Sequence, residues 1–175
     1  MIRNAILLFY IIAAFLLEST LFADTSVFAA APNILLIITV SIGFLRGKSY
    51  GALTGFICGL LYDLVFGPVV GLNALLFVLM GYISGSFCKV FFEDNLRVPV
   101  LMTGILDTAY NFIIYILFFL LRGKTSFFLY CIRCICPEVV FTVIMTILLY
   151  RLIYATNQLF GGNNDERRRS RWLSS

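Results

Sequence analysis

The sequence contains no histidine, and it has few charged residues of either sign. Without an imidazole, histidine-based acid–base catalysis and zinc sites of the HExxH type are excluded. The sequence also lacks a GxSxG nucleophile elbow and a phosphate-binding loop of the GxxxxGK[ST] type. We therefore expect a protein without enzymatic activity.

Charged residues make up only 13% of the 175 positions, whereas 61% are hydrophobic. The mean hydropathy of +0.99 is far above that of a water-soluble domain, so the composition predicts an integral membrane protein. The net charge of +4 does not indicate nucleic-acid binding, because most basic residues flank hydrophobic segments as orientation signals do. The expected surroundings are membrane lipid.

The five cysteines do not form a convincing metal or redox site. Cys131, Cys134 and Cys136 are closely spaced, but there is no second pair at zinc-like spacing and the cluster lies in apolar sequence. Small apolar packing residues are the expected role. We expect neither a metal nor a cofactor.

Six hydrophobic blocks predict an all-α protein with about six transmembrane helices, at residues 4–22, 33–45, 50–66, 71–91, 98–121 and 137–154. Pro137 is expected to open the last helix, with 127–136 as an interfacial or tilted lead-in. Block 33–45 is short for a span, and it could instead be re-entrant or buried among its neighbours. The first block could alternatively be a signal peptide, although its apolar run is long for one and ends with Glu18.

Loop charges predict the orientation. With the N-terminus inside, ten basic residues face the cytoplasm and only Arg122, Lys124 and Arg133 face outward. If block 33–45 does not cross, only Arg3 changes sides, so a cytoplasmic C-terminus is expected either way and the side of the N-terminus stays open. We expect a polytopic helical domain over residues 1–160 and a disordered, basic, cytoplasmic tail over 161–175.

The most informative motif is a set of small and polar residues repeated every four positions. The first three glycines form one smooth ridge on a helix, which permits close approach of another helix. An aspartate continues this ridge near the outer end, so the motif predicts a packing seam with a tight turn, a polar contact used by a partner or ligand, or both. The residues are Gly51, Gly55, Gly59, Asp63, Gly67 and Gly71, followed by Asn73.

Further polar residues lie inside the predicted spans: Glu18, Asp107, Asn111, Arg133 and Glu138. Asp107 and Asn111 share a helix face, and Arg133 is a possible partner of Glu138 or Asp63. We expect these groups to satisfy one another within the bundle, with ion transport as the lesser alternative. An intramembrane aspartyl site would need Asp63 and Asp107 together, but neither lies in a flanking pattern associated with that chemistry.

These residues resemble the rod shape-determining protein MreD family. The resemblance covers residues 1–160. Its specific part runs from Pro32-Asn33 to the string Gly59-Leu60-Leu61-Tyr62-Asp63-Leu64-Val65-Phe66-Gly67 with Gly71-Leu72-Asn73-Ala74-Leu75, and Asp107 and Pro137-Glu138 fit as well.

The resemblance implies a multi-pass protein of the bacterial inner membrane that acts in the cell-wall elongation machinery. It implies association with MreC, and through MreC with the MreB filament, the RodA glycosyltransferase and its transpeptidase. It further implies a fold like the six-helix substrate-binding subunit of energy-coupling-factor transporters. That likeness supplies the alternative function, a vitamin-type binding subunit of a membrane transporter.

Overall fold

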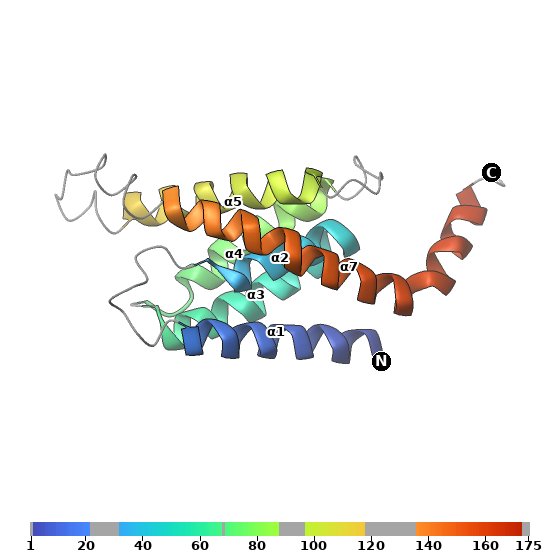
Figure 1. Ribbon diagram of the computed structural model, residues 1–175, viewed down its shortest axis with the longest axis horizontal. Helices are drawn as coiled ribbons and strands as arrows, with labels where there is room; N and C mark the ends of the chain where they lie inside the picture. The colour runs from blue at the N-terminus through green and yellow to red at the C-terminus, as the bar shows by residue number, and fades with distance from the viewer. Residues whose placement is uncertain (1, 22–31, 68, 88–96, 118–135, 173–175) are drawn as a thin grey trace.

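The computed structural model describes residues 2–21, 32–67, 69–87, 97–117 and 136–172. Six helices run through these segments, and Figure 1 shows them lying roughly along one common axis. They are α1 (Ile2–Leu21), α2 (Ile34–Arg46), α3 (Lys48–Val65), α4 (Leu72–Phe87), α5 (Arg97–Tyr115) and α7 (Cys136–Trp172). The six predicted blocks therefore all contain a helix, with ends that shift by a few residues.

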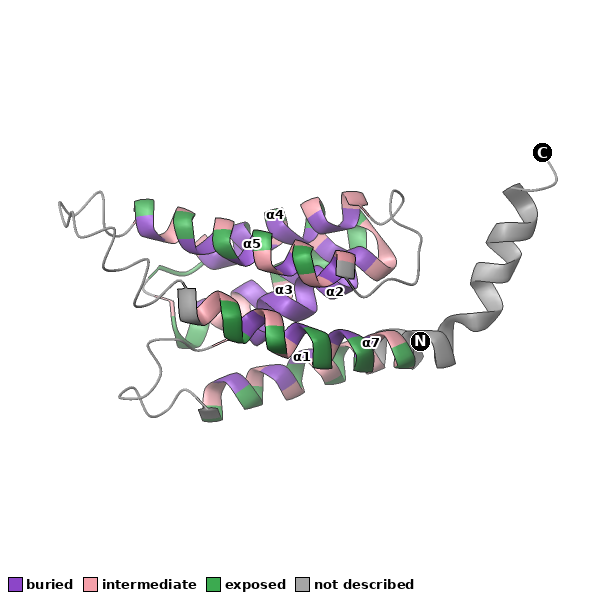
Figure 2. Ribbon diagram, turned by 45° about the horizontal axis from the view of Figure 1, so that its top comes forward, coloured by how far each residue is buried: buried purple, intermediate pink, exposed green. Residues whose placement is uncertain are grey.

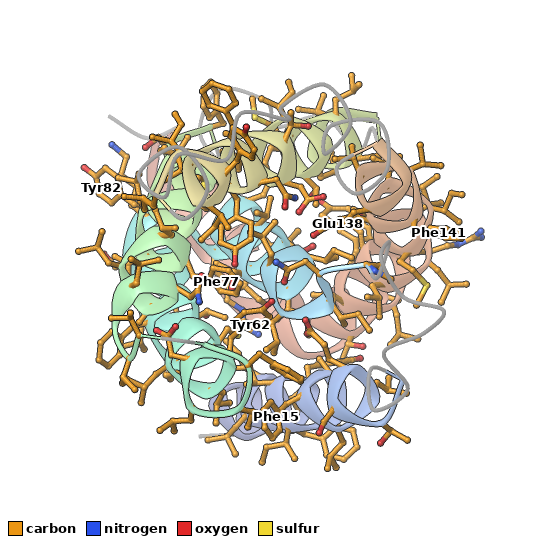
Figure 3. The ribbon with its side chains drawn as sticks, turned by 90° about the vertical axis from the view of Figure 1, so that its left-hand side faces the viewer. Phe15, Tyr62, Phe77, Tyr82, Glu138 and Phe141 are labelled. Carbon is orange, nitrogen blue, oxygen red and sulfur yellow. The ribbon has the colours of Figure 1, made fainter. Side chains whose placement is uncertain are left out.

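The short helix α2 lies at the centre of the bundle. It packs against α1, α3, α4, α5 and α7, which surround it in the end view of Figure 3. Every residue from Ile34 to Phe44 is buried. Of the alternatives that the sequence left open for this block, burial among neighbours is the arrangement that the structure shows.

Two side chains satisfy the N-terminus of α2. The Asn33 side chain caps the helix by accepting the Leu36 N–H at 3.1 Å, and Glu18 of α1 accepts the Leu35 N–H at 3.1 Å. The first N–H groups of a helix have no partner within the helix, so both carboxamide and carboxylate are favoured here. Glu18 is thereby part of the core, which ties α1 into the packed bundle.

Polar and apolar side chains are distributed as lipid requires. Thirteen polar or charged residues are buried in the described part of the chain, whereas large apolar side chains such as Phe9, Leu75, Leu101 and Leu148 are exposed. Figure 2 shows the exposed residues on the outward faces of the helices. Water would favour the reverse distribution, so the surface of this bundle is suited to a bilayer.

Two helices contain an apolar stretch long enough to cross a membrane by length and composition, Val98–Tyr115 in α5 and Glu138–Thr156 in α7. Shorter apolar helices cover Ile6–Thr20, Ile34–Arg46 and Leu72–Phe87. The structure thus supports an all-helical membrane protein, and several of its helices are shorter than a full span.

The structure continues α7 as a helix through residues 161–172. The division into a helical domain over 1–160 and a disordered, basic tail over 161–175 stays a prediction. The predicted segments 88–91, 118–121 and 127–135 lie outside the described residues.

Candidate functional site

The glycine ridge of α3 lies against α4. A Cβ atom on Gly51 would overlap the main chain of Gly81, one on Gly55 that of Phe77, and one on Gly59 that of Ala74. The two backbones therefore touch along three turns of helix, and no larger side chain fits between them. The sequence motif places this seam correctly on α3 but does not reveal its partner, which contributes its own pair of glycines, Gly81 and Gly85.

Asp63 ends the ridge and holds the turn between α3 and α4. Its Oδ2 accepts the N–H groups of Gly71 at 2.8 Å and Ala74 at 3.0 Å. Its Oδ1 accepts the N–H of Asn73 at 3.2 Å and the Asn73 side-chain amide at 2.8 Å. One carboxylate, only 2% exposed, thus caps the N-terminus of the next helix.

The glycines after Asp63 make this capping possible. A Cβ on Gly67 would collide with the Asp63 side chain, and Gly71 has φ +101°, a left-handed conformation that favours glycine. We call residues 63–74 the Asp63 turn. The four-residue repeat therefore has two physical causes, helix contact before Asp63 and turn geometry after it.

The hydrogen bonds continue from the turn to α5. Asn73 Oδ1 accepts the hydroxyl of Tyr110 at 2.8 Å, and the Tyr110 ring packs edge-on against Phe77, with centroids 5.4 Å apart. Asp63, Asn73 and Tyr110 thus join three helices in one buried chain. Tyr110 was missed from the sequence, although it lies three positions from Asp107 and so on the same face of α5.

A second polar group lies at the same end of the bundle, between α1, α5 and α7. Glu138 interacts with the Asn111 side chain and is close enough to Asp107 and Glu18 for electrostatic interaction. Figure 3 shows Glu138 directed toward the interior, whereas Phe141 on the same helix points outward. We call Glu18, Asp107 and Glu138 the acidic cluster.

The members of this cluster differ in their hydrogen bonds. Glu18 accepts the Leu35 N–H, and the Asn111 amide donates to the Asp107 main-chain oxygen at 3.2 Å. Asp107 is fully buried and its carboxyl group interacts with the Thr142 hydroxyl. That these groups satisfy one another within the bundle stays a prediction. Arg133, the predicted basic partner, lies outside the described residues.

Thr142 of α7 was another residue that the sequence did not single out. Its hydroxyl also accepts the Asn33 N–H at 3.4 Å, so it connects the start of α2 to α7. A threonine in an apolar helix usually returns its hydroxyl to the helix backbone, as Thr146 does at 2.6 Å. Nothing in the sequence distinguishes Thr142 from Thr146.

The arrangement does not offer a catalytic site. All four hydrogen bonds to Asp63 come from its own turn, and Asp107 interacts with groups of α7, so the two do not form a carboxylate pair. Within the described ranges, no three acidic or cysteine side chains lie close enough together to hold a metal ion. The geometry supports close packing of the helices against one another.

The model of one protein family, rod shape-determining protein MreD, matches residues 1–160. No curated protein and no solved structure matches the chain. The matched range includes the glycine ridge, the Asp63 turn and the acidic cluster, and it ends shortly before the basic C-terminal segment. The chain therefore belongs to the MreD family, the non-catalytic, rod shape-determining membrane proteins of the cell-elongation machinery.

Proposed function

We propose that this protein is a membrane scaffold of the bacterial cell-wall elongation complex and that its direct partner is the membrane helix of MreC. The family supplies the process in which the chain acts. We infer MreC as the partner because the motifs of this chain resemble those of MreD proteins. MreB, RodA and the transpeptidase would then be reached through the complex.

The observation that carries this proposal is an apolar rim around the Asp63 turn. Asp63 and Asn73 are themselves buried, so they shape the turn from inside. The residues around them point outward and are more than half exposed: Leu64, Val65, Val69, Val70 and Leu75. A partner helix packing here meets a surface already fixed by hydrogen bonds, which lowers the ordering cost of binding.

A scaffold of this kind acts through differential affinity. If the rim binds one state of MreC better than another, it shifts MreC toward that state in proportion to the difference in binding free energy. Assembly of RodA with its transpeptidase would then depend on which state of MreC is bound. No chemistry by this chain is required.

We place the C-terminus in the cytoplasm and the protein in the bacterial inner membrane. The support is the excess of basic residues in the loops assigned to the cytoplasmic side, ten against three. The described helices alternate in direction, so the Asp63 turn and the acidic cluster share the end opposite to Arg46 and Arg151. Both sites would then face the outer side of the membrane.

The six-helix arrangement is also what we expect of a fold like the substrate-binding subunit of energy-coupling-factor transporters. One observation favours the corresponding second function, binding of a vitamin-type small molecule. Polar side chains from several helices, including Tyr110, Asn111 and Glu138, converge at one end of the bundle. A vitamin that raises the melting temperature of the purified protein would support this alternative.

Affinity purification from native membranes tests the scaffold. Recovery of MreC and RodA is expected, whereas recovery of a pair of ATPases would favour the transporter subunit. Val70→Lys adds a charge to the rim without touching a buried residue, and it should reduce MreC recovery and shorten cells. Thr108→Val, at an exposed position on α5, is the matched control. Full MreC recovery and rod growth with Val70→Lys at wild-type protein level would refute the rim as the contact.

Asp63→Leu tests the support beneath the rim. It should weaken recovery of MreC and cell elongation because the turn loses its internal hydrogen bonds. Normal rod growth with this variant at wild-type protein level would show that the turn is not needed for the function.

A further inference from the structure

The start of α3 places a lysine over the outer surface of α4. The Lys48 ammonium nitrogen lies 5.3 Å from the centroid of the Tyr82 ring, which is close enough for a cation–π interaction. Both residues are exposed, and Figure 3 shows Tyr82 on the outer face of the bundle. The two side chains therefore meet on the surface that faces lipid.

The main chain fixes the position of this lysine. A Cβ atom on Gly85 would overlap the main chain of Gly47 and Lys48, so the start of α3 packs directly onto α4. Gly47 has φ +92°, a conformation that favours glycine, and its N–H binds the Gly43 oxygen at 2.8 Å. Because the Lys48 main chain is already held beside α4, it loses little freedom when a ligand binds.

The length of α3 puts Lys48 at the depth of the lipid headgroups. The 18 residues of α3, at about 1.5 Å each, span about 27 Å, close to a hydrocarbon core of about 30 Å, and Lys48 is the first of them. Farther along the helices, the glycine contacts between α3 and α4 put Leu53 level with Leu79, and both are exposed. The surface is therefore cationic at headgroup depth and apolar below it, which matches the two parts of a phospholipid.

The charges of the described helices are separated along the bundle. Arg46 and Arg151 lie at the same end as Lys48. Among the described residues up to Thr156, every carboxyl side chain belongs to Asp63 or to the acidic cluster, toward the opposite end. This separation favours an anionic headgroup at the Lys48 end, whereas a zwitterionic headgroup also brings a cation that the basic side chains repel.

We propose that the outer face of α3 and α4 binds one anionic phospholipid, with the Lys48 ammonium on its phosphate and an acyl chain along Leu53 and Leu79. Tyr82 holds the lysine side chain over the site, and the ammonium keeps hydrogens free to donate to phosphate oxygens. Phosphatidylglycerol has the required chemistry. The site lies at the opposite end of the bundle from the apolar rim, so the inference does not depend on the proposed contact with MreC.

Native mass spectrometry of the full chain released from nanodiscs tests the site. In nanodiscs of phosphatidylglycerol and phosphatidylcholine in equal parts, the protein should retain one tightly bound phosphatidylglycerol. Lys48→Gln should lower this retention about fivefold, as expected for the loss of one basic residue near a membrane surface, whereas Lys48→Arg should preserve it. Arg151→Gln is the matched control, because it removes the same charge at the same end from an exposed position on α7.

Tyr82→Leu tests the placement of the lysine. This change keeps an apolar side chain but removes the ring, so it should lower retention in the wild-type protein and have little further effect in Lys48→Gln. An equal loss in both backgrounds would contradict the positioning role of Tyr82. All of these substitutions are at exposed positions, and melting temperatures equal to that of the wild-type protein check that each variant folds.

Four results would overturn the proposal. Equal retention of phosphatidylcholine would show that the headgroup charge is not recognised. Equal losses in Arg151→Gln and Lys48→Gln would show that the total charge of this end attracts lipid without a defined site. Unchanged retention in Lys48→Gln would place the lipid elsewhere, and release of the lipid by inorganic phosphate, but not by sodium chloride at equal ionic strength, would show that the anion alone is bound.

Discussion

Asp63 and Asn73, ten positions apart, are joined by two hydrogen bonds to one carboxylate oxygen, from the Asn73 main-chain N–H and from its side-chain amide. The second oxygen of Asp63 binds two further N–H groups of the same turn. The turn between α3 and α4 therefore has a single side chain at its centre. This concentration makes its contribution to stability measurable.

Asp63→Leu should lower the free energy of unfolding by about 3 kcal/mol or more, because it leaves several buried N–H donors without an acceptor. Asp63→Asn keeps one acceptor oxygen, so its free energy of unfolding should lie between those of the wild-type protein and Asp63→Leu. Denaturant titration in mild detergent measures both, with Thr108→Val as the control. An Asp63→Leu protein with the wild-type midpoint would contradict the structural role of this carboxylate.

Tyr110→Phe should lower the free energy of unfolding by about 1 kcal/mol, the typical net contribution of one hydrogen bond. The ring contact with Phe77 remains, so only the bond to Asn73 is removed. In a double-mutant cycle with Asn73→Ala, the two effects should be less than additive. Strict additivity would show that the buried chain from α4 to α5 does not exist.

Gly55→Ala should lower stability by about 1–3 kcal/mol, since the added methyl group must push the α4 backbone away. Gly104→Ala is the matched control on α5, where the new Cβ meets only the Val143 side chain at 3.1 Å. A side-chain tip can move, whereas a backbone cannot. Thermal unfolding of the two proteins should differ clearly, and equal melting temperatures would mean that α3 and α4 are not in backbone contact.

Leu148→Lys tests the bilayer as the solvent of the outer surface. Leu148 is 67% exposed in the middle of the apolar stretch of α7. A lysine there should cost about 2.5–3.5 kcal/mol on insertion and reduce the amount of protein in the membrane fraction. Leu148→Met should have no such effect. An unchanged membrane level of the lysine variant would mean that this face is covered by protein.

The membrane class, the six helices and the glycine ridge could be predicted because each leaves a one-dimensional signal: hydropathy, length or a four-residue repeat. Asp63 was identified by the same repeat. Its hydrogen-bonding role could not be predicted, because a carboxylate at a helix end can face a partner, a ligand or its own backbone.

Contacts between distant segments leave no comparable signal. Thr142 and Thr146 look alike in sequence, yet only Thr142 reaches the start of α2. Tyr110 could be any aromatic residue of an apolar helix until Asn73 is placed beside it.

The enclosed helix α2 has thirteen residues, and at about 1.5 Å each they span about 20 Å, well short of a hydrocarbon core of about 30 Å. The short length of α2 causes no mismatch with the bilayer, because five other helices separate α2 from the acyl chains. Bilayer thickness consequently places no demand on its length or composition. The Ile-rich sequence of α2 is constrained by packing against the neighbouring helices. Exchanges such as Ile→Leu along α2 should therefore disturb packing more than similar exchanges on α7.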